Sequence, residues 1–194
     1  MRTIYLVRHP ATPWSGLRYA GRTDLMLSVA GRHQAEALAH VLSARVHGPA
    51  RVVSSPLARA AAAAERIARA GGWPLSVDDR WREVDFGAAE GLTFGELACA
   101  WPELARRLLA GEFAIDWPSG EQWDSFHERV VGAWRGLAEG PGRTAIVVSH
   151  GLPIATALSA AGIRSRARRL APAEVLAVRL SEPPAIAWSR RPAR

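Results

Sequence analysis

Three short apolar runs in the sequence each end in side chains that can bind an anion or exchange a proton. Arg8-His9 closes the first run, Ser54-Ser55 the second, and Ser149-His150-Gly151 the third. Arginine pairs with oxyanions through several N–H groups, and histidine can transfer a proton near neutral pH. A lone Arg-His pair would indicate little, because most histidines are structural or solvated. The chemistry therefore depends on whether the ends of the three runs meet.

Each run has the composition of a buried strand, and a helical pattern follows it. The three predicted strands are Thr3–Val7, Arg51–Ser54 and Thr144–Val148. The helices that follow them are Val29–Ala44 with Ser28 as N-cap, Leu57–Ala70 ended by Gly71-Gly72, and Gly151–Ala161. Further predicted elements are a strand at Leu75–Val77, a helix at Asp124–Leu137, and a strand pair at Val175–Leu180 and Ala185–Trp188. This alternation predicts a three-layer α/β/α sandwich with a mainly parallel central sheet.

In such a fold, right-handed crossovers place the carboxyl ends of parallel strands at one edge of the sheet. Ligands bind open α/β sheets at that edge. Arg8, His9 and His150 would meet there with Arg59, which lies in the helix after Ser54-Ser55. Helix N-termini at the same edge are suited to phosphate. Residues 79–120 form a loop-rich segment that could cover the site, and its Glu83 is the candidate acid.

Length and composition are typical of a single globular domain. The chain has 194 residues, of which 48% are hydrophobic and 22% charged. We expect one domain over residues 1–189 and a disordered tail from Arg190 to Arg194. The single cysteine, Cys99, excludes an intrachain disulfide framework and a cysteine metal cluster, and its helical surroundings predict a buried side chain.

The formal net charge of +7 comes entirely from arginine, because the sequence contains no lysine. The densest cluster, Arg164 to Arg169, is expected to be a solvated surface, with a place beside a phosphate as the second interpretation. Nucleic acid is not an expected partner, because the sequence has no recognisable binding module and no interleaved aromatic residues. No run approaches the length of a membrane span, and Met1-Arg2 leads directly into a strand. We therefore expect a cytoplasmic protein without a membrane partner.

Five sequence blocks appear in a fixed order between residues 4 and 155. The blocks are Leu6 to Pro10 with Thr12; Gly21, Asp24, Leu27, Ser28, Gly31, Gln34 and Ala35; Ser54 to Ala60; Glu83, Gly87, Glu90 and Gly91; and Ser149 to Gly151. Any one block would be a weak signal, but five in this order are specific. In these blocks the chain resembles the histidine phosphatase superfamily, in its phosphoglycerate-mutase-like branch.

The resemblance implies a role for each residue expected at the sheet edge. His9 would attack phosphorus and form a phosphohistidine. Arg8, Arg59 and His150 would hold the phosphoryl oxygens, the histidine as an imidazolium. Glu83 would protonate the leaving oxygen and then activate water. No metal or other cofactor is implied, since arginines and an imidazolium supply the positive charge.

The resemblance also places four further residues beside the phosphate or the substrate, namely Thr12, Ser15, Gly21 and Gly151. The chain departs from the family pattern close to these residues. Pro10 replaces the usual glycine and lacks an N–H, and Ala11 replaces the usual Glu or Gln. Ser15 stands where many relatives carry asparagine, and Ala63 replaces a common threonine. Asp85 and Glu90 are alternatives to Glu83, although Glu90 is expected to order its loop.

The resemblance leaves the reaction and the substrate open. A phosphatase is favoured over a mutase, because the segment between Leu92 and Val148 is short and contains few arginines. A non-catalytic protein that binds a phosphorylated ligand is the third possibility. In its short length and its loop from Glu83 to Gly91, the chain most resembles bacterial α-ribazole phosphatases and broad-specificity phosphatases. The expected partner is therefore a small phosphorylated metabolite. Trp117 and Trp123 flank Pro118 to Glu121, and they could either line the substrate pocket or pack in the core. The protein could be a monomer or a homodimer.

Overall fold

The structure is a computed structural model that describes residues 1–163 and 170–192. Its strands are β1 (Arg2–Arg8), β2 (Arg51–Ser54), β3 (Leu75–Val77), β4 (Thr144–Ser149), β5 (Val175–Leu180) and β6 (Ala185–Arg190). Its α-helices are α1 (Val29–Arg45), α2 (Ala58–Gly71), α3 (Phe94–Ala100), α4 (Pro102–Leu109), α5 (Trp123–Glu139) and α6 (Gly151–Ala160). Two 3₁₀ turns, η1 (Asp79–Trp81) and η2 (Gly87–Ala89), flank Glu83.

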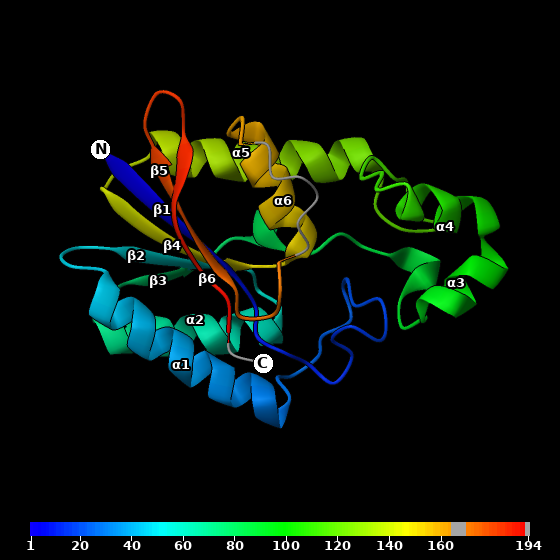
Figure 1. Cartoon of the computed structure of the whole chain (residues 1–194), viewed down its shortest axis with the longest axis horizontal. Coiled ribbons are helices and arrows are strands. Elements are labelled where there is room, and N and C mark those ends of the chain that lie inside the picture. Colours follow the sequence, from blue (N-terminus) through cyan, green and yellow to red (C-terminus); the bar gives the residue numbers. More distant parts are fainter. Residues whose placement is uncertain (164–169, 193–194) are drawn as a thin grey trace.

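The six strands form one sheet in the order β3-β2-β4-β1-β5-β6 (Figure 1). The four strands β3, β2, β4 and β1 pair in parallel, whereas β5 and β6 are antiparallel to their neighbours. The predicted mainly parallel sheet is therefore confirmed. The predicted pair of late strands is also present, with β5 and β6 antiparallel.

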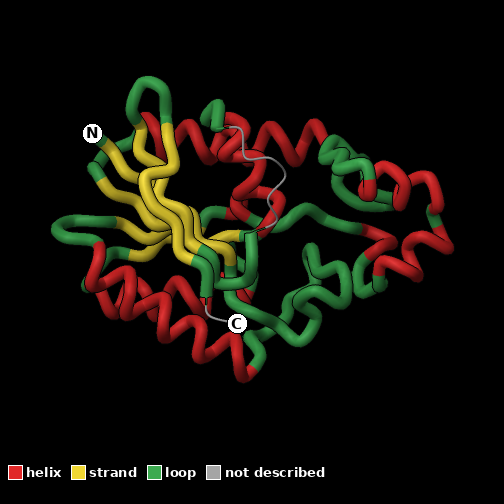
Figure 2. The backbone as a smooth tube through the Cα atoms, in the orientation of Figure 1, coloured by secondary structure: helices red, strands yellow, loops and turns green. Residues whose placement is uncertain are grey.

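Alternation of side chains along the central strands gives the sheet two apolar faces. On β1, Ile4 and Leu6 belong to the core that includes α5 and α6, whereas Tyr5 and Val7 belong to the core that includes α1 and α2. Figures 1 and 2 show α1 and α2 on one side of the sheet and α5 and α6 on the other. The predicted three-layer α/β/α sandwich is confirmed.

Strand register brings the polar ends of the three predicted runs together. Arg8, at the end of β1, is in register with Ser149 at the end of β4, and Ser54 on β2 pairs with the residue before Ser149. Across the gap between β1 and β4, the amide of His9 donates to the carbonyl of Ser149 at 2.8 Å. This pairing fixes His9 beside His150. The start of α1 then holds the chain after His9, because the Ser28 amide donates to the Ala11 carbonyl at 3.0 Å.

The segment between β3 and α5 forms short turns and helices, as the sequence predicts. In Figure 1, α3 and α4 lie to the right of the sheet, beyond its carboxyl edge. Cys99 on α3 is exposed, so the prediction of a buried cysteine is wrong. The reason is that α3 has only seven residues and buries Leu97, which leaves most of its surface in solvent.

The C-terminal prediction needs a correction at its first residue. Arg190 was expected in a disordered tail, but it is the last residue of β6 and pairs with Val175. Arg191 follows, and its Nε lies 3.3 Å from a carboxylate oxygen of the buried Glu174. Residues 193–194 lie outside the described residues, as does the predicted arginine cluster at 164–169. Within the described ranges, no helix is both long and apolar enough to cross a membrane.

Candidate functional site

His9 lies buried at the sheet edge with one ring nitrogen already engaged. Its Nδ1 lies 2.7 Å from the carbonyl oxygen of Pro10. A carbonyl can only accept, so Nδ1 carries the imidazole proton and Nε2 keeps its lone pair. Burial lowers the pKa of His9 well below its ordinary value, and the positive charges of Arg8 and Arg59 lower it further. His9 is therefore a neutral imidazole whose Nε2 can act as a nucleophile.

His150, fully buried at the start of α6, is the second imidazole of the site. Its ring centre lies 5.0 Å from that of His9, and its Nε2 lies 2.8 Å from the hydroxyl of Ser55. Burial lowers its pKa well below the ordinary value, and Arg59, His9 and Arg8 act in the same direction. The family resemblance predicts an imidazolium here, whereas burial and the neighbouring charges favour the neutral ring. A bound phosphate dianion would act in the opposite direction.

The second ring nitrogen of His150 points to what the site can bind. Nδ1 is buried and has no hydrogen-bond partner among the described residues. The hydroxyl of Ser55 already accepts from the Leu57 amide at 3.3 Å, so its own proton is available to His150 Nε2. If Ser55 donates to Nε2, the proton of the neutral ring lies on Nδ1, and this N–H group has no acceptor among the described residues. An oxygen of a bound anion would supply that acceptor.

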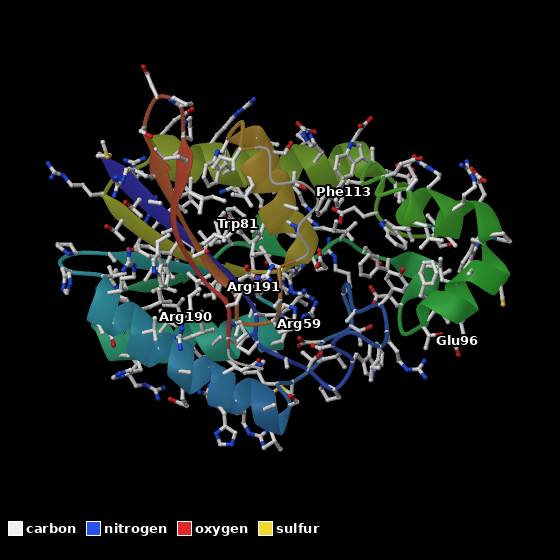
Figure 3. All side chains as sticks on the ribbon, viewed as in Figure 1. Arg59, Trp81, Glu96, Phe113, Arg190 and Arg191 are labelled. Atoms are coloured by element: carbon white, nitrogen blue, oxygen red, sulfur yellow. The ribbon has the colours of Figure 1, made fainter. Side chains whose placement is uncertain are left out.

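Arg8 and Arg59 bring two guanidinium groups to the same place. Arg59 is completely buried on α2, near the middle of the molecule (Figure 3). It donates to the backbone carbonyls of Thr23 at 2.8 Å, Ala20 at 3.1 Å and Gly21 at 2.7 Å. Its Nε is buried without a hydrogen-bond partner in the described chain. Arg59 thus fixes the loop before α1 and keeps donor capacity for an anion.

Arg8 is anchored from the other side of the site. Its Nη1 donates to the carbonyl of Leu170, and its backbone amide donates to the carbonyl of Glu174 at 3.0 Å.

Burial lowers the pKa of Arg59 from its ordinary value, and the carboxylates of Glu83 and Glu90 oppose this shift. The arginines give the site its positive charge.

Glu83 supplies a buried carboxyl group at the same edge. Its Oε1 accepts from the Val84 amide at 3.1 Å, and its Oε2 lies 3.8 Å from where a Cβ on Gly151 would stand. Burial raises the pKa of Glu83, and the positive charges of Arg59 and Arg8 oppose that rise only in part. Such a carboxyl can hold a proton at higher pH than an exposed glutamate and give it to a leaving group.

Glu90 orders the loop before α1, as predicted from the sequence. Its carboxylate accepts from the amides of Gly21 at 3.1 Å, Arg22 at 2.8 Å, Thr23 at 3.3 Å and Phe86 at 3.2 Å. It also accepts from the Thr23 hydroxyl at 2.6 Å. Glu90 therefore joins the loop that Arg59 holds to the segment that follows Glu83.

Several predicted binding residues contact the backbone of the loops around the site. Thr12 and Ser15 are joined to each other, with the Thr12 amide donating to the Ser15 hydroxyl at 2.9 Å. Gly21 packs so closely that a Cβ there would lie 2.2 Å from the Val84 carbonyl oxygen. Gly151 is the first residue of α6 and adjoins Glu83. The contacts of Thr12, Ser15 and Gly21 support the loops around the site.

The two flanking tryptophans follow the packing interpretation. Trp117 is buried and lies edge-on to Phe86, with ring centres 4.4 Å apart. Trp123 is partly buried against Phe126, with ring centres 5.7 Å apart. Both belong to the core above the sheet or pack against it.

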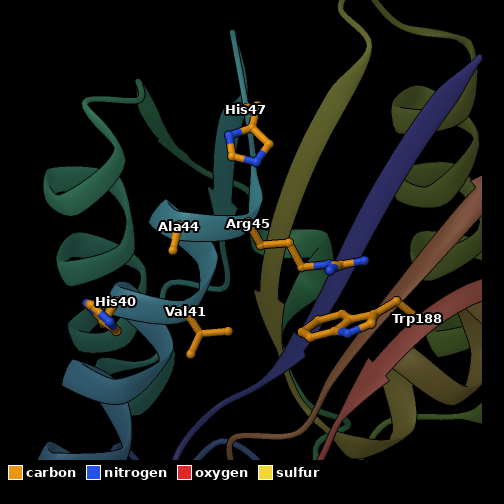
Figure 4. Close-up of a pocket in the computed structure, with 6 residues that line it drawn as sticks. All are labelled: His40, Val41, Ala44, Arg45, His47 and Trp188. Carbon is orange, nitrogen blue, oxygen red and sulfur yellow. The ribbon is translucent and has the colours of Figure 1, made fainter.

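A separate hollow on the surface lies away from these residues. It has a volume of about 380 Å³ and lies between α1 and β6, lined by His40, Val41, Ala44, Arg45, His47 and Trp188 (Figure 4). The Arg45 guanidinium lies 4.3 Å from the centre of the Trp188 ring and covers it. None of the residues at the carboxyl edge lines this hollow. Across residues 1–163 and 170–192, His, Cys, Asp and Glu side chains form no group of three that could hold a metal ion.

A family model and several relatives match most of the chain. The family model described as the histidine phosphatase superfamily (branch 1) matches residues 4–181. A bifunctional protein of Mycobacterium tuberculosis is 45% identical over 153 residues, covering 78% of this chain and 42% of the relative. The chain thus spans less than half the length of that relative. A probable phosphoglycerate mutase of Citrobacter koseri is 34% identical over 161 residues, covering 82% of this chain and 74% of the relative.

Solved structures agree with the fold. A mycobacterial glucosyl-3-phosphoglycerate phosphatase in complex with VO3 matches with a TM-score of 0.80 and 29% identity. The match covers 92% of this chain and 93% of that structure. A crystal structure from Thermus thermophilus matches with a TM-score of 0.68 and 31% identity, over 91% of this chain and 92% of that one.

The Ser55 contact predicts the tautomer of His150. Nitrogen-15 NMR of the neutral ring should show the proton on Nδ1, and Ser55→Ala should give a mixture of tautomers. If about half of the rings keep the proton on Nδ1, inhibition by inorganic phosphate should weaken about twofold, because only that tautomer presents the donor. Ser54→Ala is the matched control, because the Ser54 hydroxyl donates to the Ser55 carbonyl at 2.7 Å and not to the imidazole. A wild-type ring protonated on Nε2 would contradict this arrangement.

Proposed function

The chain belongs to the histidine phosphatase superfamily, and on that premise we propose that it is a metal-independent phosphomonoesterase. It acts on a small phosphorylated metabolite through a phosphohistidine intermediate. The observation that carries the proposal is His9: a buried, neutral ring with Nδ1 held by the Pro10 carbonyl and Nε2 free to attack. Hydrogen-bond donors surround His9, from Arg8, Arg59 and His150, and the two arginines add positive charge. This environment stabilises a phosphoryl group during its transfer.

In the first step, Nε2 of His9 attacks phosphorus in line with the ester oxygen. A P–N bond forms, the P–O bond to the leaving group breaks, and the proton of Glu83 goes to the departing oxygen. Arg8, Arg59 and Nδ1–H of His150 stabilise the charge on the remaining phosphoryl oxygens. The raised pKa of Glu83 supports its part, because burial keeps the proton available for transfer.

In the second step, water attacks the phosphohistidine. Ionised Glu83 takes a proton from this water, the P–N bond breaks, and the products are inorganic phosphate and neutral His9. The two steps return Glu83 to its protonated form. The guanidinium groups of Arg8 and Arg59 supply positive charge at every stage, and His150 supplies a hydrogen-bond donor, so we expect activity to survive a metal chelator.

Hydrolysis is favoured over a mutase reaction because three arginines between Glu83 and Ser149 already form ion pairs with glutamates. Arg106 pairs with Glu103, Arg107 with Glu112 and Arg129 with Glu121. A mutase of this kind would use such arginines to grip a second anionic group on the substrate. The name of the Citrobacter koseri relative keeps the mutase reaction as the alternative. It predicts that phosphoglycerates interconvert faster than they release phosphate.

The substrate is proposed only by class. The resemblance to α-ribazole phosphatases suggests α-ribazole 5′-phosphate, and the name of the mycobacterial structure adds glucosyl-3-phosphoglycerate. A panel of phosphometabolites that contains both, together with phosphoglycerates, separates these candidates by kcat/KM. We further propose a cytoplasmic enzyme built as one domain over residues 1–189, as a monomer or a homodimer.

The proposed reaction is tested with p-nitrophenyl phosphate. Wild type should release p-nitrophenol with or without EDTA, and His9→Ala should reduce the rate about 1,000-fold or more, because it removes the nucleophile. Inorganic phosphate should still bind the variant through the arginines. If wild type and His9→Ala are equally inactive while both bind phosphate, the protein is a binding module and the proposal fails.

The pH dependence follows from the two shifted groups. His9 must be unprotonated to attack, and its lowered pKa moves the acid limb of kcat/KM below 6.5. Glu83 must be protonated to serve the leaving group, and its raised pKa keeps it so above pH 4.5. Activity should therefore fall on the alkaline side as Glu83 ionises, and Glu83→Gln should be slower and lack that limb. An alkaline limb of unchanged position in Glu83→Gln would assign it to another group.

A further inference from the structure

Glu83 lies in a part of the chain that regular structure does not hold. Residues 83–86 form neither helix nor strand and join the two 3₁₀ turns η1 and η2. A general acid has to lie within hydrogen-bond reach of the oxygen that it protonates. The Val84 amide holds one carboxyl oxygen of Glu83 from within the segment, whereas the backbone of the segment itself is held by contacts from outside it.

Arg129, on α5, provides such contacts. Its Nη1 donates to the carbonyls of Arg80 at 2.8 Å and Arg82 at 2.9 Å, and its Nη2 donates to that of Glu83 at 3.2 Å. The remaining donors face Glu121, with Nε 2.6 Å from Oε1 and Nη2 2.8 Å from Oε2. All five N–H groups of the guanidinium are thereby used.

Glu121 continues the same connection on the far side of Glu83. Its Oε2 accepts from the Asp85 amide at 3.2 Å, and its own amide donates to the Asp85 carbonyl at 3.0 Å. The side chains of Glu121 and Arg129 are only 11% and 17% exposed. Shielding from water strengthens the Coulomb attraction in this bidentate pair, and loss of either partner would leave the other charge shielded and unpaired.

The backbone around Glu121 fits closely against the segment after Glu83. A Cβ on Gly120 would lie 2.4 Å from the Asp85 carbonyl oxygen, and one on Gly87 would lie 2.3 Å from the Pro118 carbonyl oxygen. The Ala88 amide donates to Pro118 at 2.8 Å. The Pro118 to Glu121 motif, singled out in the sequence for its flanking tryptophans, therefore holds the acid segment.

We propose that Arg129, held by Glu121, is a positioning residue that fixes Glu83 for proton transfer to the leaving group. This role rests on the proposed function, in which Glu83 is the general acid. Arg129 binds the carbonyls of the two peptide bonds that flank the Cα of Glu83, so it sets the direction in which the Glu83 side chain leaves the backbone. A displacement of about 1 Å in a reacting group can cost about 100-fold in rate.

The test uses leaving groups that differ in their need for a proton. Phenolate is a poor leaving group and needs the acid, whereas 2,4-dinitrophenolate leaves without one. Arg129→Lys keeps the charge but cannot bridge three carbonyls and a carboxylate. We expect kcat/KM to fall about 30- to 100-fold for phenyl phosphate and less than about threefold for 2,4-dinitrophenyl phosphate. Glu83→Gln should show the same selective loss, only larger.

Two further variants complete the design. Glu121→Gln keeps the size of the side chain but removes the charge that holds Arg129, and it should give the same selectivity. If Arg129→Lys does not fold, as shown by circular dichroism, Glu121→Gln decides the question alone. Arg135→Lys, at an exposed position on the same helix, is the matched control and should leave both substrates unaffected.

The outcomes separate this inference from the function on which it rests. Equal loss on both substrates in folded Arg129→Lys and Glu121→Gln would give the pair a merely structural role and overturn the proposal. No loss on either substrate would also overturn it. Equal loss on both substrates in Glu83→Gln would remove Glu83 as the acid, and the positioning role with it. That last result would leave the phosphohistidine chemistry of His9 intact.

Discussion

Arg8 and Arg59 place two positive charges where His9 and His150 are shielded from water, and the other features of the site depend on that crowding. Burial and the arginines together lower the pKa of both imidazoles, so each ring is neutral. A neutral His9 is a nucleophile, whereas a protonated one is not. The same excess of positive charge makes the pocket favourable for a phosphoryl dianion. One electrostatic arrangement thus prepares the nucleophile and attracts its target.

Keeping a guanidinium fully buried requires partners, and the loops around the site supply them. Arg59 donates to three carbonyls of residues 20–23, and Glu90 holds the amides of that same loop. The loop therefore lies between a cation that binds its carbonyls and an anion that binds its amides. Glu83 is fixed in a comparable way by Arg129 and Glu121. Hydrogen bonds to backbone, which any sequence provides, do most of the positioning.

Much of this could be predicted from the sequence, because strand ends and turn residues carry local signals. The predicted bounds of β2, Arg51–Ser54, agree with the structure, and Ser28 caps α1 as predicted. The carboxyl ends of β1, β2 and β4 also meet at one edge of the sheet, as predicted. The contacts that Arg129 and Ser55 make could not be predicted from the sequence. Arg129 binds carbonyls 46 to 49 residues away, and His150 lies 95 residues from Ser55, so only the tertiary structure brings the partners together. Cys99 was misplaced because a helical pattern does not show which helices lie at the surface.

The central claim is that Nε2 of His9 accepts the phosphoryl group, and trapping the intermediate tests it most directly. The protein is mixed with a phosphomonoester substrate, quenched in alkali, in which phosphohistidine survives, and mapped by peptide mass spectrometry. Phosphorus NMR of the labelled peptide then identifies the nitrogen. The account predicts one phosphoryl group, on Nε2 of His9, and none in His9→Ala. A phosphoryl group on His150, or continued turnover by wild type with His9 never labelled, would contradict it.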